Sequence, residues 1–108
     1  MAANVHYSDA SKQDLEHIGD YIAQELKNPS AALRTVNDMQ DTIDKLADFP
    51  LMGTLLSAIV EADTADYRFL ICGKYIAFYR PQEREVLIDR ILYGKRDYVS
   101  ILFRGMIH

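Results

Sequence analysis

Apolar residues in the first half of the chain recur at intervals of three and four, which is the period of an α-helix. The triplet "VHY" (5–7) predicts a short strand, and residues 9–26 predict an amphipathic helix. The apolar stripe of that helix comprises Leu15, Ile18, Ile22 and Leu26. A second stripe predicts another helix that runs to about residue 47 and is stopped by "DFPLMG" (48–53). This stripe comprises Leu33, Val36, Met39, Ile43 and Leu46.

Serines indicate where the two helices begin. Either Ser8 or Ser11 is expected to cap the first helix, and Ser11 followed by Asp14 resembles a capping box. Ser30 is expected to cap the second helix. Because the link between them is short, the two helices are predicted to form a hairpin with their apolar stripes facing inward.

The second half of the chain has the composition of β-strands. Residues 54–66 show no clear period and are predicted to form a loop. Three segments rich in β-branched and aromatic residues then predict strands, at 67–72, 75–80 and 85–92. A compact turn at Gly73-Lys74 and a looser turn at 81–84 would connect them. The predicted fold class is α+β: a short N-terminal strand and a helical hairpin packed on a C-terminal antiparallel sheet, in the order β-α-α-β-β-β.

Strict alternation assigns the strand side chains to two faces. In the first of the three strands it places Tyr67, Phe69 and Ile71 opposite Arg68, Leu70 and Cys72. In the third it places Val86, Ile88 and Arg90 opposite Leu87, Asp89 and Ile91.

Length and composition predict one soluble domain. The chain has 108 residues, which allows a single core over residues 1–108, and 99–108 is either a terminal helix or a tail. No apolar run approaches the length of a membrane span, and the first residues lack the pattern of a signal peptide. Cys72 is the one cysteine, so an internal disulfide is excluded and a cytoplasmic location is expected. Its apolar surroundings predict a buried thiol.

The formal net charge of −4 is distributed unevenly. Residues 1–66 contain twelve acids and four bases (−8), whereas residues 67–108 contain eight bases and four acids (+4). Charges are screened over about 8 Å at cellular ionic strength, so a basic surface can act locally on an acidic protein. Candidate contacts to a macromolecule are therefore expected in the second half.

Familiar catalytic and metal-binding patterns are missing from the sequence. The histidines and the cysteine have no metal-ligand spacing, there is no glycine-rich phosphate loop, and no nucleophile motif is present. No cofactor is expected. The remaining candidates are strand arginines, tyrosines and the cluster "YGKRDY" (93–98), which places two bases directly after an apolar strand. Alternatively, Arg68 and Arg90 pair with acids on the helices while Tyr75 and Tyr79 pack in the core.

Four segments in order resemble the RelE/ParE superfamily of bacterial toxins. They are "LEHIGDYIAQE", "LADFPLMG", "YRFLICGKYIAFYR" and "ILYGKRDY", and the resemblance extends from about residue 5 to residue 98. It implies the toxin of a type II toxin–antitoxin pair, which inhibits growth and is neutralised by a cognate antitoxin. Homodimers or toxin–antitoxin hetero-oligomers are expected, and the antitoxin should cover the helical hairpin and a sheet edge.

Members of the superfamily act on two kinds of target. RelE-like members cut mRNA on the ribosome without a metal, whereas ParE-like members poison DNA gyrase. Arg68 matches a ParE-like strand arginine, Arg96 a basic position of both branches, and Tyr98 a ParE-like aromatic position. Tyr93 stands where many relatives have histidine. The arginine of the ribonucleases falls on Ile76 or Tyr75, so the resemblance favours the ParE-like branch.

Two main hypotheses follow from the resemblance. In the first, the chain inhibits gyrase and has no active site, and its target-binding residues are Arg68, Tyr93, Lys95, Arg96 and Tyr98. In the alternative, it is a metal-independent endoribonuclease, and its catalytic residues are Arg68, Arg96, Tyr93 and Tyr98. A third hypothesis is a degenerate toxin that retains only its antitoxin or DNA-regulating partner. An apolar tail with Ile101, Phe103 and Met106 would either pack on the sheet or contact a partner.

Overall fold

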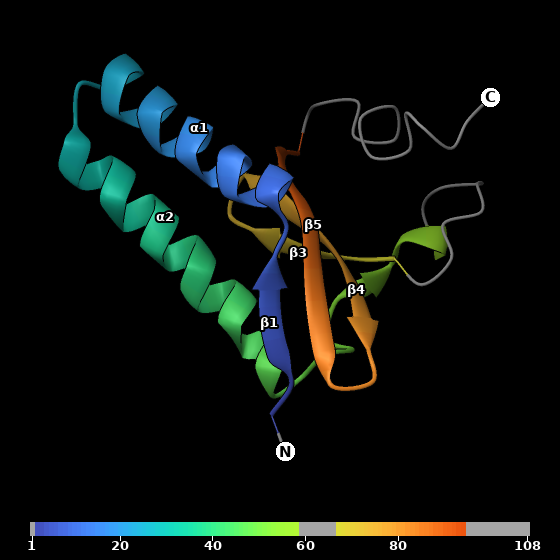
Figure 1. Cartoon of the computed structure of the whole chain (residues 1–108). Helices are drawn as coiled ribbons and strands as arrows, with labels where there is room; N and C mark the ends of the chain where they lie inside the picture. Colours follow the sequence, from blue (N-terminus) through green and yellow to red (C-terminus); the bar gives the residue numbers. More distant parts are fainter. Residues whose placement is uncertain (1, 59–66, 95–108) are drawn as a thin grey trace.

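The computed structural model describes residues 2–58 and 67–94, which form two layers, a helical hairpin and a β-sheet (Figure 1). The helices are α1 (Asp9–Glu25) and α2 (Pro29–Asp44), and α2 continues into a 3₁₀ turn, η1 (Lys45–Ala47). The strands are β1 (Asn4–Tyr7), β2 (Thr54–Leu55), β3 (Arg68–Cys72), β4 (Tyr75–Gln82) and β5 (Glu85–Tyr93). A second 3₁₀ turn, η2 (Leu56–Ala58), follows β2. The predicted α+β class and element order are confirmed.

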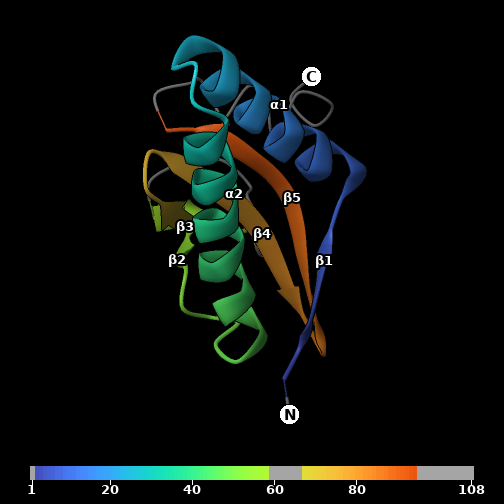
Figure 2. The same ribbon diagram turned by 90° about the vertical axis from the view of Figure 1, so that its left-hand side faces the viewer.

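The strands of this part of the chain form one sheet in the order β1-β5-β4-β3-β2. The pairs β2–β3, β3–β4 and β4–β5 are antiparallel, as was predicted for the three C-terminal strands. Strand β1 instead pairs in parallel with β5, so the sheet as a whole is mixed. Both helices cover the same face of this sheet, and Figure 2 looks onto them from that side. None of the helices described has the length and apolarity needed to span a membrane.

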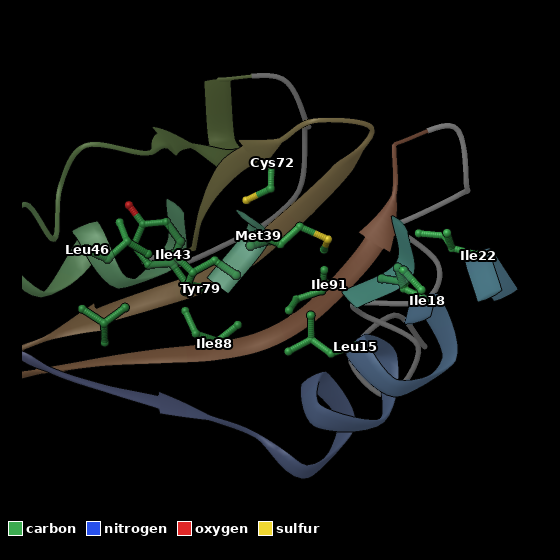
Figure 3. Close-up of a cluster of buried hydrophobic side chains, with 13 residues drawn as sticks. Leu15, Ile18, Ile22, Met39, Ile43, Leu46, Cys72, Tyr79, Ile88 and Ile91 are labelled. Atoms are coloured by element: carbon green, nitrogen blue, oxygen red, sulfur yellow. The ribbon is translucent and has the colours of Figure 1, made fainter. Parts of the chain in front are cut away.

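The main core lies between the helical hairpin and the sheet. Figure 3 shows side chains of α1 and α2 meeting those of β3, β4 and β5. They include Leu15, Ile18, Ile22, Met39, Ile43, Tyr79, Ile88 and Ile91. A smaller cluster of Leu56, Phe78 and Leu92 lies on the other face. The inward stripes predicted for the two helices are therefore confirmed for these residues, but not for Leu26 and Leu33, which are 66% and 64% exposed.

The helix caps differ from the prediction in two respects. Ser8 caps α1, because its Oγ accepts a hydrogen bond from the N–H of Ser11 at 3.0 Å. The predicted capping box of Ser11 and Asp14 is wrong, since the Asp14 carboxylate is used elsewhere. The predicted cap at Ser30 is also wrong: Asn28 Oδ1 accepts from the Ala31 N–H at 3.1 Å, and Pro29 occupies the first turn. Proline suits that position because its missing N–H would have no partner there.

Residues 54–58 were predicted as part of a loop, but they form β2 and the turn η2. Strand β2 has two residues, which pair with Phe69 and Arg68 of β3. So short a strand is set by its tertiary neighbour and has no period of its own to detect. The rest of the predicted loop lies outside the described residues.

A β-bulge in β5 changes the predicted alternation. Tyr79 pairs with Ile88 and Phe78 pairs with Arg90, so Asp89 is an extra residue on β5. As a result Ile91 joins Ile88 in the main core, whereas strict alternation placed the two on opposite faces. The alternation predicted for β3 holds, since Leu70 and Cys72 contact the main core and Phe69 contacts the smaller cluster.

The outer edge of β5 is completed by a side chain. The main-chain pairing with β1 ends where the Ser8 N–H donates to Ile88 O, and Ser8 Oγ then donates to Asp89 O at 2.7 Å. Farther along, the Ile91 N–H donates to Asp14 Oδ2 at 2.9 Å. The same carboxylate accepts two hydrogen bonds from the Arg90 guanidinium, at 2.8 and 2.9 Å. The predicted pairing of Arg90 with a helix acid is thus confirmed.

Replacement of Asp14 is expected to destabilise the fold. Asp14→Ala leaves the Ile91 N–H and a half-buried guanidinium without their acceptor, which should lower the free energy of unfolding by about 2–3 kcal/mol. Urea unfolding measures this. Asp20→Ala, an exposed acid on the same helix, should change it by less than about 0.5 kcal/mol.

A double-mutant cycle with Arg90→Met separates the two roles of Asp14. The loss caused by Asp14→Ala should shrink when Arg90 is already replaced, and the part that remains reports the Ile91 N–H. Equal losses in both backgrounds would contradict a coupling between the two side chains.

Candidate functional site

The side chain of Tyr79 holds the loop that follows α2 and η1. Tyr79 is fully buried, and its hydroxyl donates to Pro50 O and accepts from the Gly53 N–H, both at 2.9 Å. Burial raises the pKa of this hydroxyl, which therefore stays protonated and able to donate. A Cβ at Gly53 would lie 2.5 Å from the Tyr79 hydroxyl and 2.7 Å from Phe69 O, so only glycine fits there.

Arg68 holds the same loop from β3. Its Nη1 donates to Gly53 O at 2.8 Å and to Leu51 O at 3.2 Å. The alternative that Arg68 pairs with a helix acid is therefore wrong, because its partners are two backbone carbonyls. Tyr79 packs in the core as that alternative predicted, but its hydroxyl also has the two loop partners given above.

A third strand arginine lies on the sheet face that the helices leave open. Arg80 donates to the Asp89 carboxylate at 3.0 and 3.3 Å, and its guanidinium lies 5.3 Å from the centre of the Tyr67 ring. Burial and the contact with Asp89 raise the pKa of Tyr67 to about 12. Burial acts to lower the pKa of Arg80, but the hydrogen bond and the charge of Asp89 raise it overall. The three residues form one polar cluster.

A groove of about 920 Å³ runs between the helical hairpin and the β3–β4 turn. Its wall includes Ile18, Ile22, Met39, Cys72, Tyr75 and Tyr93. Tyr75 and Tyr93 meet edge to face, with ring centres 5.8 Å apart. Burial raises the pKa of Tyr75, and the neighbouring Tyr21 and Tyr93 raise it further. The groove thus combines an apolar floor with tyrosines at one end.

The candidate residues predicted from the sequence are not all close together. Arg68 pairs with Tyr79 and Tyr93 pairs with Tyr75, so the two lie four residues apart along β4, or about 13 Å. Tyr93 is the last residue of β5, and the following Gly94 N–H donates to Lys74 O at 3.0 Å. The beginning of "YGKRDY" is thus fixed to the β3–β4 turn.

The other predicted residues, Lys95, Arg96 and Tyr98, lie outside the described residues. So does the segment 99–108, for which a terminal helix or tail was predicted. Their roles in target binding or catalysis stay predictions, as do those of Arg68 and Tyr93. Within 2–58 and 67–94, no group of three or more histidine, cysteine, aspartate or glutamate side chains is placed to hold a metal ion.

The joint role of Tyr79, Arg68 and Gly53 was not predicted from the sequence. The loop partners are 15 to 29 positions away from the side chains that hold them, so no local period reveals them. The only signal in the sequence was Pro50 and Gly53 of "DFPLMG", which indicated the end of a helix and a loop but not the side chains that anchor the loop.

The sequence matches one protein family over most of its length. The profile described as "ParE toxin of type II toxin-antitoxin system, parDE" covers residues 5–98. The chain belongs to the ParE toxin family. No significant match was found among curated protein sequences.

Solved structures agree with the ParE-type fold. A chain of the chromosomal ParDE system from P. aeruginosa has a TM-score of 0.70 and 22% identity, covering 85% of this chain and 96% of that one. A chain of the RelBE2 toxin–antitoxin complex from Mycobacterium tuberculosis has a TM-score of 0.58 and 20% identity, covering 86% and 99%. YafQ from E. coli has a TM-score of 0.54 and 16% identity, covering 94% of this chain and 98% of that one. At these identities the likeness concerns the fold, and it confirms the RelE/ParE-like architecture.

Two tyrosines of this ParE-family fold allow a matched test of the loop anchor. Tyr79→Phe leaves the Gly53 N–H and Pro50 O without their partner and should cost about 1–3 kcal/mol of unfolding free energy. The Tyr7 hydroxyl is buried with no partner among the described residues, and burial raises its pKa. Tyr7→Phe should therefore be neutral or slightly stabilising. Urea unfolding of both variants measures the two changes in unfolding free energy. A larger loss for Tyr7→Phe than for Tyr79→Phe would contradict the role of Tyr79 as the loop anchor.

The thiol of Cys72 should make stability depend on alkaline pH. Cys72 is 5% exposed, which confirms its predicted burial, and burial raises the pKa of its thiol from 9.0 to about 11. The protonated thiol stabilises the folded state fully below pH 9, and this stabilisation is lost as the pH rises towards 11. Urea unfolding under reducing conditions should show a shallower alkaline decline for Cys72→Ala than for the wild type. If the stability of both proteins declines in parallel, the tyrosines alone cause the loss of stability at alkaline pH.

Proposed function

We propose that this ParE-family chain is a toxin that binds DNA gyrase in the cytoplasm and blocks its activity, without an active site of its own. The observation that carries the proposal is the state of the three described strand arginines. Arg90 is bonded to Asp14, Arg80 to Asp89, and Arg68 to two loop carbonyls. Each guanidinium therefore has a structural partner.

Cleavage of RNA has different requirements from binding to a protein. It needs a base for the attacking 2′-hydroxyl, an acid for the leaving oxygen and a cation that stabilises the charge on phosphorus. An arginine that already pairs with a carboxylate would have to give up that partner to meet a phosphate. The arrangement of Arg80 and Arg90 therefore supports a binding function over a nuclease function.

The proposed neutralising partner is a cognate antitoxin. The groove between the hairpin and the β3–β4 turn offers an apolar floor to an amphipathic helix. Next to it, β2 pairs only with Arg68 and Phe69, so within the described residues the edge of β3 from Leu70 to Cys72 has no strand beside it. Ile71 on that edge is 64% exposed. An antitoxin segment that covers both features would fit the mode expected for the superfamily.

A gyrase assay tests the proposal directly. Purified chain, gyrase, ATP and relaxed plasmid are combined, and lost supercoiling and trapped cleavage complexes are scored. We expect inhibition by the wild type, its reversal by the antitoxin, and its loss on Arg96→Ala. Full supercoiling by gyrase in the presence of protein that stops growth would reject gyrase as the target.

Substitutions of Tyr93 distinguish the ribosome-dependent nuclease from the gyrase inhibitor. If the tyrosine is catalytic, Tyr93→Phe abolishes mRNA cleavage in a translation extract, since the hydroxyl is lost. If the ring is a contact surface, Tyr93→Phe keeps activity and Tyr93→Ala loses it. If the chain neither stops growth nor inhibits gyrase, the third hypothesis, a degenerate toxin, remains.

A further inference from the structure

A rigid apolar ridge lies at the C-terminal end of α2, apart from the groove. It consists of Phe49, Leu51, Met52 and Leu55, which are 64%, 64%, 42% and 43% exposed. Three of these residues fall within four positions of the chain, and Leu55 follows on β2. Exposed apolar side chains grouped in this way are typical of protein interfaces.

The backbone beneath the ridge is held at almost every position. The Phe49 N–H donates to Lys45 O, and the Met52 N–H donates to Phe49 O. The carbonyls of Pro50, Leu51 and Gly53 accept from Tyr79 and Arg68. A fixed backbone that exposes apolar side chains loses little conformational entropy on binding. The buried Tyr79 therefore presents the ridge in one conformation.

The charges beside the ridge indicate what kind of partner fits it. Exposed Asp41, Asp44 and Asp48 precede it in the chain, and Lys45 is the one base between residues 41 and 55. The last carbonyls of α2 add a partial negative charge at the same end. Arg68 of β3 adds a second base, and its guanidinium donates to loop carbonyls. This rim repels phosphate groups and favours an apolar protein surface with lysine or arginine around it.

A second copy of the chain is a poorer fit to the same ridge. A two-fold contact would place one acidic rim against another, which costs free energy. A nucleic acid or an anionic membrane is disfavoured for the same reason.

We propose that this ridge is the surface that docks the toxin's protein target, through an apolar patch with a basic rim on that target. The inference rests on the proposed function in so far as the target is gyrase. Arg68, expected from the sequence to bind the target, would then act as a positioning residue that holds the loop.

Binding measurements with paired serine variants of the full chain test the ridge. Leu51→Ser should weaken binding to gyrase by about 30-fold, as for an interface anchor, and should abolish growth inhibition. Leu33→Ser removes an equally exposed leucine, 64%, from α2, and should leave both unchanged. Both variants should keep the wild-type urea midpoint and the wild-type affinity for the antitoxin.

Charge reversal provides the second arm. Asp48→Lys should weaken target binding about 3- to 10-fold by repelling a basic rim, with a larger effect at low salt. Asp20→Lys makes the same charge change on α1 and should have no effect. A gain of binding or of toxicity for Asp48→Lys would indicate a phosphate-bearing partner and overturn the proposal.

The remaining outcomes separate the ridge from the proposed function. If Leu51→Ser binds gyrase and inhibits growth as the wild type does, the ridge proposal is overturned, while gyrase remains the proposed target. A parallel loss of antitoxin affinity, or a change of oligomeric state, assigns the ridge to another partner and also overturns it. If the wild type does not bind gyrase, the proposed function fails, and the ridge is judged by growth inhibition with the same four variants. A wild type that neither binds gyrase nor inhibits growth overturns both.

Discussion

The unpaired edge of β5 is the constraint on which the rest of the fold depends. β1 covers that edge only as far as Ile88, and an open N–H beyond it would be buried beneath α1. The Asp14 carboxylate accepts from the Ile91 N–H and binds Arg90 at the same time. One side chain therefore completes the sheet edge, attaches α1 to it and neutralises a strand arginine.

The bulge at Asp89 makes this arrangement possible and also determines the opposite face. With one extra residue on β5, Ile91 returns to the main core, and Asp89 pairs with Arg80 beside Tyr67. Each of the two arginines then faces its own aspartate. A strand without the bulge would direct Ile91 away from the helices, so core packing and charge pairing depend on the same backbone irregularity.

Sequence periodicity was sufficient for the elements but not for their junctions. The stripes of Ile18 and Met39 predicted both helices because burial against a sheet requires that spacing. Asp14 was misassigned because its partners, Arg90 and Ile91, lie more than seventy positions away. Strand β2 and the bulge were not predicted for a related reason: both are defined by their pairing with residues of a neighbouring strand, which lie far away in the sequence or on another strand. In the candidate site, the residue types at Arg68 and Tyr79 were informative, whereas their attachment to the loop required coordinates.

The two proposed binding surfaces occupy different parts of α2. Residues of α2 between Ala31 and Thr42 line the groove, whereas the ridge begins after η1, beyond the end of the helix. An antitoxin helix confined to the groove would leave the ridge exposed. Neutralisation under this arrangement requires antitoxin bulk that blocks the approach of the target without binding the ridge itself. Because Tyr79 and Arg68 hold the loop by its backbone, neutralisation by deforming the ridge would also have to break these buried and partly buried hydrogen bonds. Steric obstruction of the target is therefore the less costly mechanism.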